Sequence, residues 1–131
     1  MSTSGLEVVR RYRELVFGER AQEAIAFLSQ DLELVFPQGT VGYTELTGWL
    51  SEPPEEFDHL LLENVEAGIH ELPDGGVLSE TDQVYRWKET GEVSNREHRA
   101  MLWRVENGKI RYMKFFVKPD DAWAEAGVER P

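Results

Sequence analysis

The segment NREHRAMLWRV, residues 95–105, contains an acid and a base two positions apart, Glu97 and Arg99. In an extended chain alternate side chains point to the same side, so these two groups face one way. A carboxylate in an apolar cavity can act as a general base, and a neighbouring guanidinium can orient it. Tyr12, in a helical segment, adds a hydroxyl that can donate to a substrate oxygen. These residue types predict acid–base catalysis with Tyr12, Glu97 and Arg99 as the catalytic group.

The same residues also have a purely structural interpretation. Glu97 and Arg99 can form an ion pair at the wet mouth of a cavity, because a buried charge needs strong compensation. Tyr12 can be a half-buried helix residue whose hydroxyl bonds to the backbone. The sequence leaves both interpretations open.

Other kinds of catalytic site lack their sequence signatures. No nucleophile elbow, phosphate-binding loop or dinucleotide-binding fingerprint is present in the sequence. The three histidines, His59, His70 and His98, are not at the spacing of metal ligands. We therefore predict neither a metal nor another cofactor.

The composition is typical of one globular domain, and we treat residues 1–131 as a single unit. Hydrophobic residues make up 40% of the chain, with four Trp, four Tyr and six Phe, which is enough for a real core. No run of about 18 apolar residues is present, so no membrane span is predicted. The segment MSTSGLEVVRRYREL lacks the apolar stretch of a signal peptide. The absence of cysteine fits a reducing compartment, and we predict a cytoplasmic protein.

The net charge of −11 argues against nucleic-acid binding, because such binding rests on Lys and Arg side chains that neutralise phosphates. Half of the 14 basic residues nevertheless lie between Arg96 and Lys118. Neutralisation by acidic neighbours in the folded chain explains this cluster, and we predict no nucleic-acid partner.

The spacing of apolar residues changes along the chain from a helical period to a period of two. Ser4 and Glu7 form a capping-box pattern at the start of the first helical segment. Helices followed by an antiparallel meander predict an α+β fold, a cone-shaped curved antiparallel sheet with N-terminal helices on its concave face. Such a cone leaves a cavity where a ligand can bind. Helices are predicted near 5–17, 20–28 and 42–51, and strands over 31–36, 57–72, 77–89, 95–105 and 109–118, with a short terminal helix.

Three stretches of the sequence resemble the nuclear transport factor two-like superfamily, within it the SnoaL-like, ketosteroid-isomerase-like and limonene-epoxide-hydrolase-like group. RYRELVFGERAQEAIAFLSQDLELVFP is similar to the helix–helix–strand opening of ketosteroid isomerases. VLSETDQVYRW resembles the central strand of the epoxide hydrolases, and VENGKIRYMKFF resembles the final hairpin of nearly all members. The resemblance implies a cystatin-like α+β roll, a small and largely apolar ligand in the cone, and a homodimer.

The chain departs from that group at the positions of its catalytic acids. The isomerases have an aspartate base just before the proline that ends the first strand, and here the matching residue is Phe36. The arginine and aspartate of the epoxide hydrolases match Thr81 and Gln83, and their second aspartate matches Phe115. Tyr12 stands where the isomerases place the helix tyrosine that donates to the substrate oxygen.

The register of the last hairpin depends on the turn at Asn107-Gly108. A two-residue turn brings His98, Ala100 and Leu102 inward. The resemblance favours a three-residue loop with a bulge, which shifts the register by one. In that register Glu97, Arg99, Met101 and Trp103 face inward.

The strand part of the cavity lining follows from this register and from the inward face of residues 77–88, whose other face bears four charges. The ligand-binding residues predicted on these strands are Ser79, Thr81, Gln83, Tyr85, Met101, Trp103, Met113 and Phe115, and Phe36 and Trp49 are added to them.

Three functions are consistent with such a cavity. The first is a cofactor-independent isomerase, dehydratase or cyclase acting on a small apolar or polycyclic molecule. The second is a non-catalytic binding protein with the same cavity, and the third is a dimerisation module whose cone is filled by its own side chains. The outer face supports a homodimer in each case, because an apolar centre inside a charged rim is typical of an interface. That centre consists of Ala100, Leu102, Tyr112 and Phe116.

Overall fold

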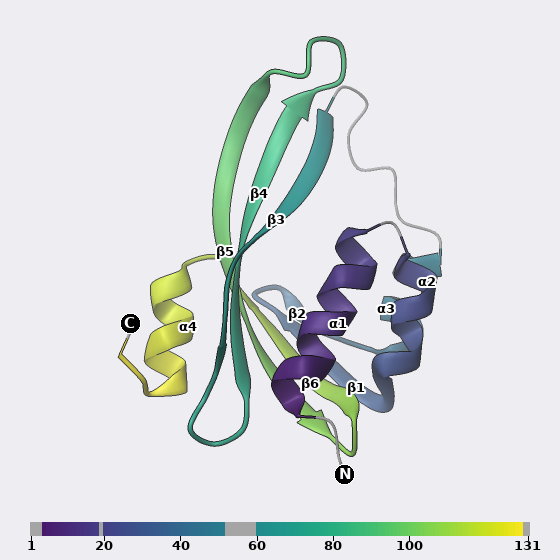
Figure 1. Ribbon diagram of the computed structural model, residues 1–131, viewed down its shortest axis with the longest axis vertical. Helices are drawn as coiled ribbons and strands as arrows, with labels where there is room; N and C mark the ends of the chain where they lie inside the picture. Colours follow the sequence, from purple (N-terminus) through teal and green to yellow (C-terminus); the bar gives the residue numbers. More distant parts are fainter. Residues whose placement is uncertain (1–3, 19, 52–59, 130–131) are drawn as a thin grey trace.

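A computed structural model describes residues 4–18, 20–51 and 60–129 of the chain (Figure 1). Helix α1 spans Gly5–Phe17, and the Ser4 side chain caps it by accepting a hydrogen bond from the Glu7 N–H at 3.2 Å. Helix α2, Ala21–Ala24, continues into a 3-10 turn over Ile25–Phe27, and α3 spans Tyr43–Ser51. The three predicted N-terminal helices are therefore confirmed. Among the helices of the described residues, none combines the length and apolar character needed to cross a membrane.

The described strands form one six-stranded sheet in the order β2-β1-β6-β5-β4-β3. The last four strands make the predicted antiparallel meander, but β1 pairs with β6 in parallel, so the sheet is mixed. The short β2 was not predicted; it returns antiparallel to β1 after the turn at Pro37. The strands are β1 Leu28–Phe36, β2 Gly39–Gly42, β3 Leu60–Glu71, β4 Val77–Trp87, β5 Val93–Glu106 and β6 Lys109–Phe116.

Helices cover both faces of this curved sheet (Figure 1). Helices α1 to α3 lie on the concave side, which we call the inner face, and α4, Pro119–Ala126, lies on the opposite, outer face. The predicted α+β cone is confirmed.

The turn between β5 and β6 has two residues, so the predicted three-residue loop is wrong. Asn107 and Gly108 are both left-handed, with φ of 54° and 76°, as a tight hairpin turn of this twist requires. The extra residue lies further along β6, where Val105 pairs with Ile110 but Arg104 pairs with Tyr112. This bulge gives the predicted inward set of Glu97, Arg99, Met101 and Trp103 by a different route.

Each face has its own apolar cluster. On the inner face α1 packs Val9 and Tyr12 against Trp103 and Met113. On the outer face the predicted interface centre is already covered, because Trp123 of α4 packs in one cluster with residues that include Ala100, Leu102 and Phe116. These three side chains are buried inside the monomer and cannot form the dimer interface assigned to them.

Candidate functional site

The inner face places most of the predicted site residues in adjacent rows. Cross-strand pairing of β4 with β5 sets Ser79 beside Met101, Thr81 beside Arg99, and Gln83 beside Glu97. Directly opposite residues have neighbouring side chains, so the rows become more polar from Ser79 towards Gln83. The polar end of the face is the end that α1 does not close.

Glu97 and Arg99 form an ion pair at this polar end. An Arg99 Nη2 to Glu97 Oε2 distance of 2.7 Å joins them, and their side chains are 20% (Arg99) and 33% (Glu97) exposed. The Tyr85 hydroxyl donates to the same Glu97 oxygen at 3.4 Å, and Arg99 Nη1 donates to the Val117 carbonyl at 3.0 Å. We call Tyr85, Glu97 and Arg99 the mouth cluster. The cluster holds a partly desolvated carboxylate in a fixed orientation, as a general base requires.

Tyr12 lies deeper and apart from the mouth cluster. Its ring packs edge-on against Trp103 with centroids 5.6 Å apart, and the residue is only 4% exposed. Burial raises the pKa of its hydroxyl, so the group stays protonated as a donor, and within the described residues it makes no hydrogen bond. Trp103 and Glu97 are six residues apart on one strand, roughly 20 Å in extended chain. The structure therefore does not bring Tyr12 and Glu97 to one reacting atom.

Three of the predicted ligand contacts lie in the closed part of the core. The Trp103 indole N–H donates to Ser79 Oγ at 2.8 Å, and both residues are buried. Met113 pairs with Trp103 across the hairpin and is buried with it. These residues form the floor beneath the polar end.

An aromatic trio forms a side wall of the same face. The Phe36 ring lies 6.2 Å from Trp49 and 5.9 Å from Phe115, measured between centroids. Met101, paired with Phe115 and half-buried, extends the wall towards the mouth cluster. Phe36 and Phe115 occupy positions that matched catalytic acids in the resemblance, so the wall is apolar where those proteins have charge.

Arg13 is a site residue that the sequence analysis missed. It is 5% exposed; its Nη2 donates to Thr81 Oγ1 at 2.8 Å and to the Glu80 carbonyl at 3.1 Å. Its Nη1 lies 3.6 Å from a Glu66 oxygen. Burial, partly offset by Glu66, lowers the pKa of this guanidinium. The available signal was spacing, because Arg13 is four residues after the buried Val9 and so lies on the buried stripe of α1.

The charges on the inner face are balanced. Arg13 and Arg99 are matched by Glu66 and Glu97, so these four groups together carry no net charge. Among the residues that the structure describes, no group of three His, Asp or Glu side chains is placed to hold a metal ion. The arrangement suits a largely apolar ligand with one polar end.

No family model matches this chain, and no curated protein matches it, but many solved structures do. An NTF2-like protein from Burkholderia thailandensis is 18% identical with a TM-score of 0.68, over 98% of this chain and 99% of that one. The chain has the nuclear transport factor two-like fold. A candidate polyketide cyclase from Pseudomonas putida is 16% identical with a TM-score of 0.69, over 95% of this chain and 98% of that one. A candidate ketosteroid isomerase from Kribbella flavida is 16% identical with a TM-score of 0.65, over 88% of this chain and 78% of that one.

The nuclear transport factor two-like fold is what these comparisons establish. Identities of 16–18% fix an architecture, whereas function resides in the particular site built on it.

Proposed function

We propose that the inner face binds a small, largely apolar molecule whose polar end meets the mouth cluster. The observation that supports this most is the Glu97–Arg99 pair at 2.7 Å, oriented by Tyr85 and set beside an apolar wall. The pair fixes the carboxylate in one orientation beside apolar side chains, which is the placement that recognition of a ligand's polar end needs. The candidate polyketide cyclase and ketosteroid isomerase of the same fold support a small-molecule ligand.

Glu97 gives this pocket an acid–base chemistry without a cofactor. Glu97 would take a proton from the ligand, and Arg99 would hold the carboxylate in place and stabilise the charge that develops. Isomerases, dehydratases and cyclases use such a step. Tyr12 packs against Trp103, away from the mouth cluster. It could therefore donate a hydrogen bond only to the far end of a long, polycyclic ligand.

A non-catalytic binding protein is the second candidate. The aromatic trio favours it, because Phe36 and Phe115 place rings where the catalytic acids of similar proteins stand. The cavity would then bind and release an apolar metabolite unchanged.

A thermal-shift screen of steroid-like, terpenoid and polyketide-like compounds tests the pocket first. The best binder is then measured with Glu97→Gln and with Glu63→Gln, a control that removes one carboxylate from the outer face of β3. An enzyme loses turnover in Glu97→Gln while its affinity stays within about tenfold, and a carrier only loses affinity. Equal behaviour of both variants would remove Glu97 from the site.

We also propose a homodimer formed by the part of the outer face that α4 leaves uncovered. Leu61 and Val65 of β3 are 54% and 40% exposed there, opposite Arg86 and Asp82. Charges of both signs on one face allow two copies of an acidic chain to meet. Val65→Lys should shift the mass from dimer to monomer in light scattering; a monomeric wild type at micromolar concentration would contradict the proposal.

We propose a cytoplasmic location for the protein. The chain has no cysteine to form a disulfide, as is common in a reducing compartment. Fractionation of cells expressing a tagged chain tests this directly, and recovery outside the cytoplasm would contradict it.

A further inference from the structure

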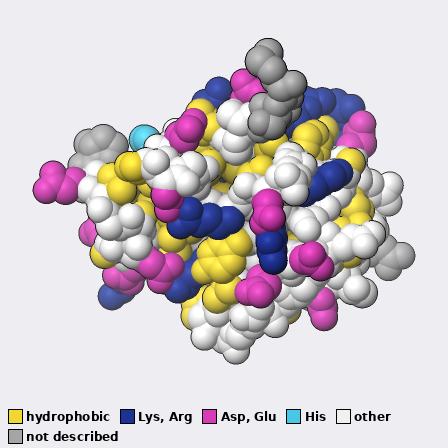
Figure 2. Space-filling model, turned by 90° about the horizontal axis from the view of Figure 1, so that it is seen from below, with side chains coloured by type: hydrophobic (Ala, Val, Ile, Leu, Met, Phe, Trp, Pro, Cys, Tyr) yellow, Lys and Arg dark blue, Asp and Glu magenta, His cyan; other side chains and the backbone are white. Residues whose placement is uncertain are grey.

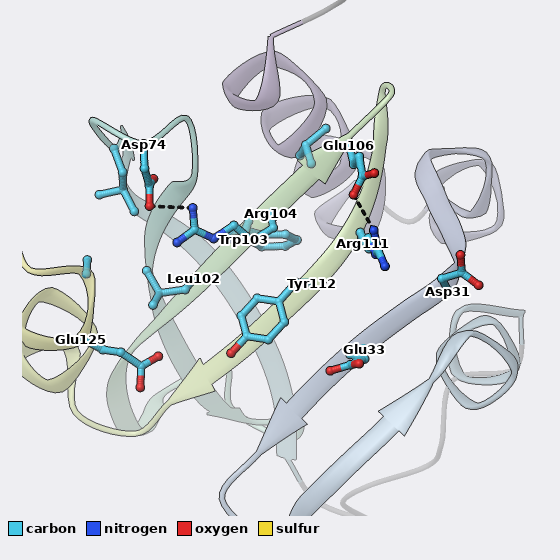
Figure 3. A pocket seen from close by; sticks show the side chains of 13 residues that line it. Asp31, Glu33, Asp74, Leu102, Trp103, Arg104, Glu106, Arg111, Tyr112 and Glu125 are labelled. Carbon is cyan, nitrogen blue, oxygen red and sulfur yellow. Dashed lines mark hydrogen bonds and ion pairs between the residues drawn. The ribbon is translucent and has the colours of Figure 1, made fainter.

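A groove of about 640 Å³ lies on the outer face, on the opposite side of the sheet from the mouth cluster. Helix α4, the turn between β3 and β4, and strand β1 border it (Figure 3). The view from below shows hydrophobic side chains exposed between charged ones of both signs (Figure 2). Ligand pockets for small molecules have about 300–1,000 Å³, so the groove has the size of a site.

Tyr112 lies in the middle of this groove, between Glu33 of β1 and Glu125 of α4 (Figure 3). Strand pairing sets Glu33 on one side of Tyr112 and Arg104 on the other. The Tyr112 side chain is half-buried, and within the described residues its hydroxyl makes no hydrogen bond. The ring and its hydroxyl are therefore available to a ligand.

The two guanidinium groups of the groove are already paired. Arg104 Nη1 is 2.7 Å from Asp74 Oδ2, and Arg111 Nη1 is 2.6 Å from Glu106 Oε2. The pKa of Arg111 is raised, first by its hydrogen bond to Glu106 and more weakly by the nearby carboxylates of β1. An anionic ligand would have to displace one of these partners.

Negative charge is in excess beside Tyr112. Five carboxylates line the groove against two guanidiniums. Glu125 is bonded to Lys114 at 2.6 Å, but the carboxylates of Asp31 and Glu33 have no hydrogen bond or ion pair within the described part of the chain. Arg111, whose pKa these two carboxylates help to raise, is close enough to act on them, but its ion pair is with Glu106. Carboxylates therefore outnumber cations at the β1 side of the ring.

We propose that this groove binds a small organic cation, an amine or quaternary ammonium attached to an apolar body. The cation would lie on the face of the Tyr112 ring, where the ring quadrupole attracts it, within reach of the Glu33 carboxylate. Leu72 and Leu102, which are largely buried but line the groove, would form the floor beneath the apolar body. A small molecule fits better than a polypeptide because α4 and the β3–β4 turn close the groove on two sides.

Calorimetric titration with benzyltrimethylammonium tests the proposal, with benzyl alcohol and benzoate as neutral and anionic controls. We expect binding with a Kd of about 1 mM for the cation and none for the controls at the same concentration. Salt at about 0.5 M should weaken the binding, since part of the attraction is between charges. Amide signals of Glu33, Arg104 and Tyr112 should shift in the nitrogen–proton spectrum.

Substitutions distinguish binding of the cation in the groove from its general electrostatic attraction to an acidic protein. Tyr112→Leu should lower the affinity for the cation about tenfold, and Glu33→Gln should lower it about threefold. Tyr112→Phe keeps the ring and should bind as the wild type does, as should Glu89→Gln, which removes a carboxylate far from the groove. Equal binding of benzyl alcohol, unchanged affinity in Tyr112→Leu and Glu33→Gln, or no binding at tenfold the expected Kd would each overturn the proposal. None of these outcomes tests the proposed site on the inner face.

Discussion

The two faces of the sheet use adjacent residues of one strand in different ways. On β5, Glu97 and Arg99 form the mouth cluster with Tyr85 on the inner face, while His98 between them points outward. His98 Nδ1 is 2.5 Å from Asp82 Oδ1, and Nε2 is 3.2 Å from Glu80 Oε1. A shift of one residue in register would exchange these two sets. The bulge in β6 thus decides which of these side chains lie on the inner face of the sheet.

Both faces are closed at one end by a helix, but not equally. The inner face lies under α1, a helix of 13 residues, and the outer face under α4, of 8 residues. Short helices depend on tertiary contacts for their stability. We therefore expect the packing of α1 on the inner face to be more stable than the packing of α4 on the outer face.

Trp103→Ala should have the largest effect on stability. Trp103 fills the inner core, contacts Tyr12 and donates to Ser79, and truncation leaves a cavity and an unpaired hydroxyl. We expect a loss of about 3–5 kcal/mol in the free energy of unfolding, measured in urea. Trp49→Ala is the matched control, because Trp49 is exposed. Similar losses for both would contradict the assignment of Trp103 to the core.

Trp123→Ala should cost less, about 3 kcal/mol. Trp123 packs beside His70 with ring centroids 5.1 Å apart, but its buried N–H has no acceptor among the described residues. Hydrogen exchange should show loss of protection confined to α4 and the strand residues beneath it. Loss of protection in α1 of this variant would show that the packing of α1 and the packing of α4 on the sheet are not independent.

Arg13→Met should lower stability by about 1–3 kcal/mol. The change removes the hydrogen bonds to Thr81 and the Glu80 carbonyl but keeps much of the apolar volume beside Phe17. Arg10→Met, on the exposed side of α1, is the control and should be nearly neutral. Equal values for the two variants would mean that Arg13 does not tie α1 to β4.

His98→Asn should remove a small pH dependence of stability. The pKa of His98 is raised, first by its hydrogen bond to Asp82 and further by Glu80. A raised pKa in the folded state means that this stabilisation is complete below the unfolded value of about 6.5 and is lost as pH rises through the folded value. Its size should stay below about 1 kcal/mol, because the imidazole is over one-third exposed.

Urea unfolding at several pH values checks the His98 prediction. The wild type should lose stability relative to His98→Asn as the pH rises above about 6.5. The opposite slope would show that the imidazole is neutral in the folded protein. The inner-face variants should leave this pH dependence unchanged.

Much of the fold follows from local patterns in the sequence. The period of two in residues 77–87 correctly put Thr81 and Gln83 on the inner face, and the capping box of Ser4 was visible in four residues. The four-residue β2 has too little pattern to be recognised, and nothing local indicates the parallel pairing of β1 with β6.

The candidate sites were harder to predict because they join residues that are far apart in the sequence. Residues around Leu102 looked like an interface, since the docking of α4 on them is a tertiary contact. Tyr112 and Glu33 meet only through the parallel pairing, so the outer groove has no signature in the sequence. Glu97 and Arg99 were predicted to share one face because their two-residue spacing is itself local, and the structure pairs them there.

Methyl signals of methionine give the most direct test of binding at the inner face. The chain has three methionines, of which Met101 lies half-buried beside the mouth cluster and Met113 lies deeper on the same face. The protein is labelled at the methionine methyl carbon and titrated with the strongest binder from the thermal-shift screen. We expect the Met101 signal to move in proportion to occupancy and the Met113 signal to move less. A ligand that saturates the protein while both signals stay in place would contradict the proposed site.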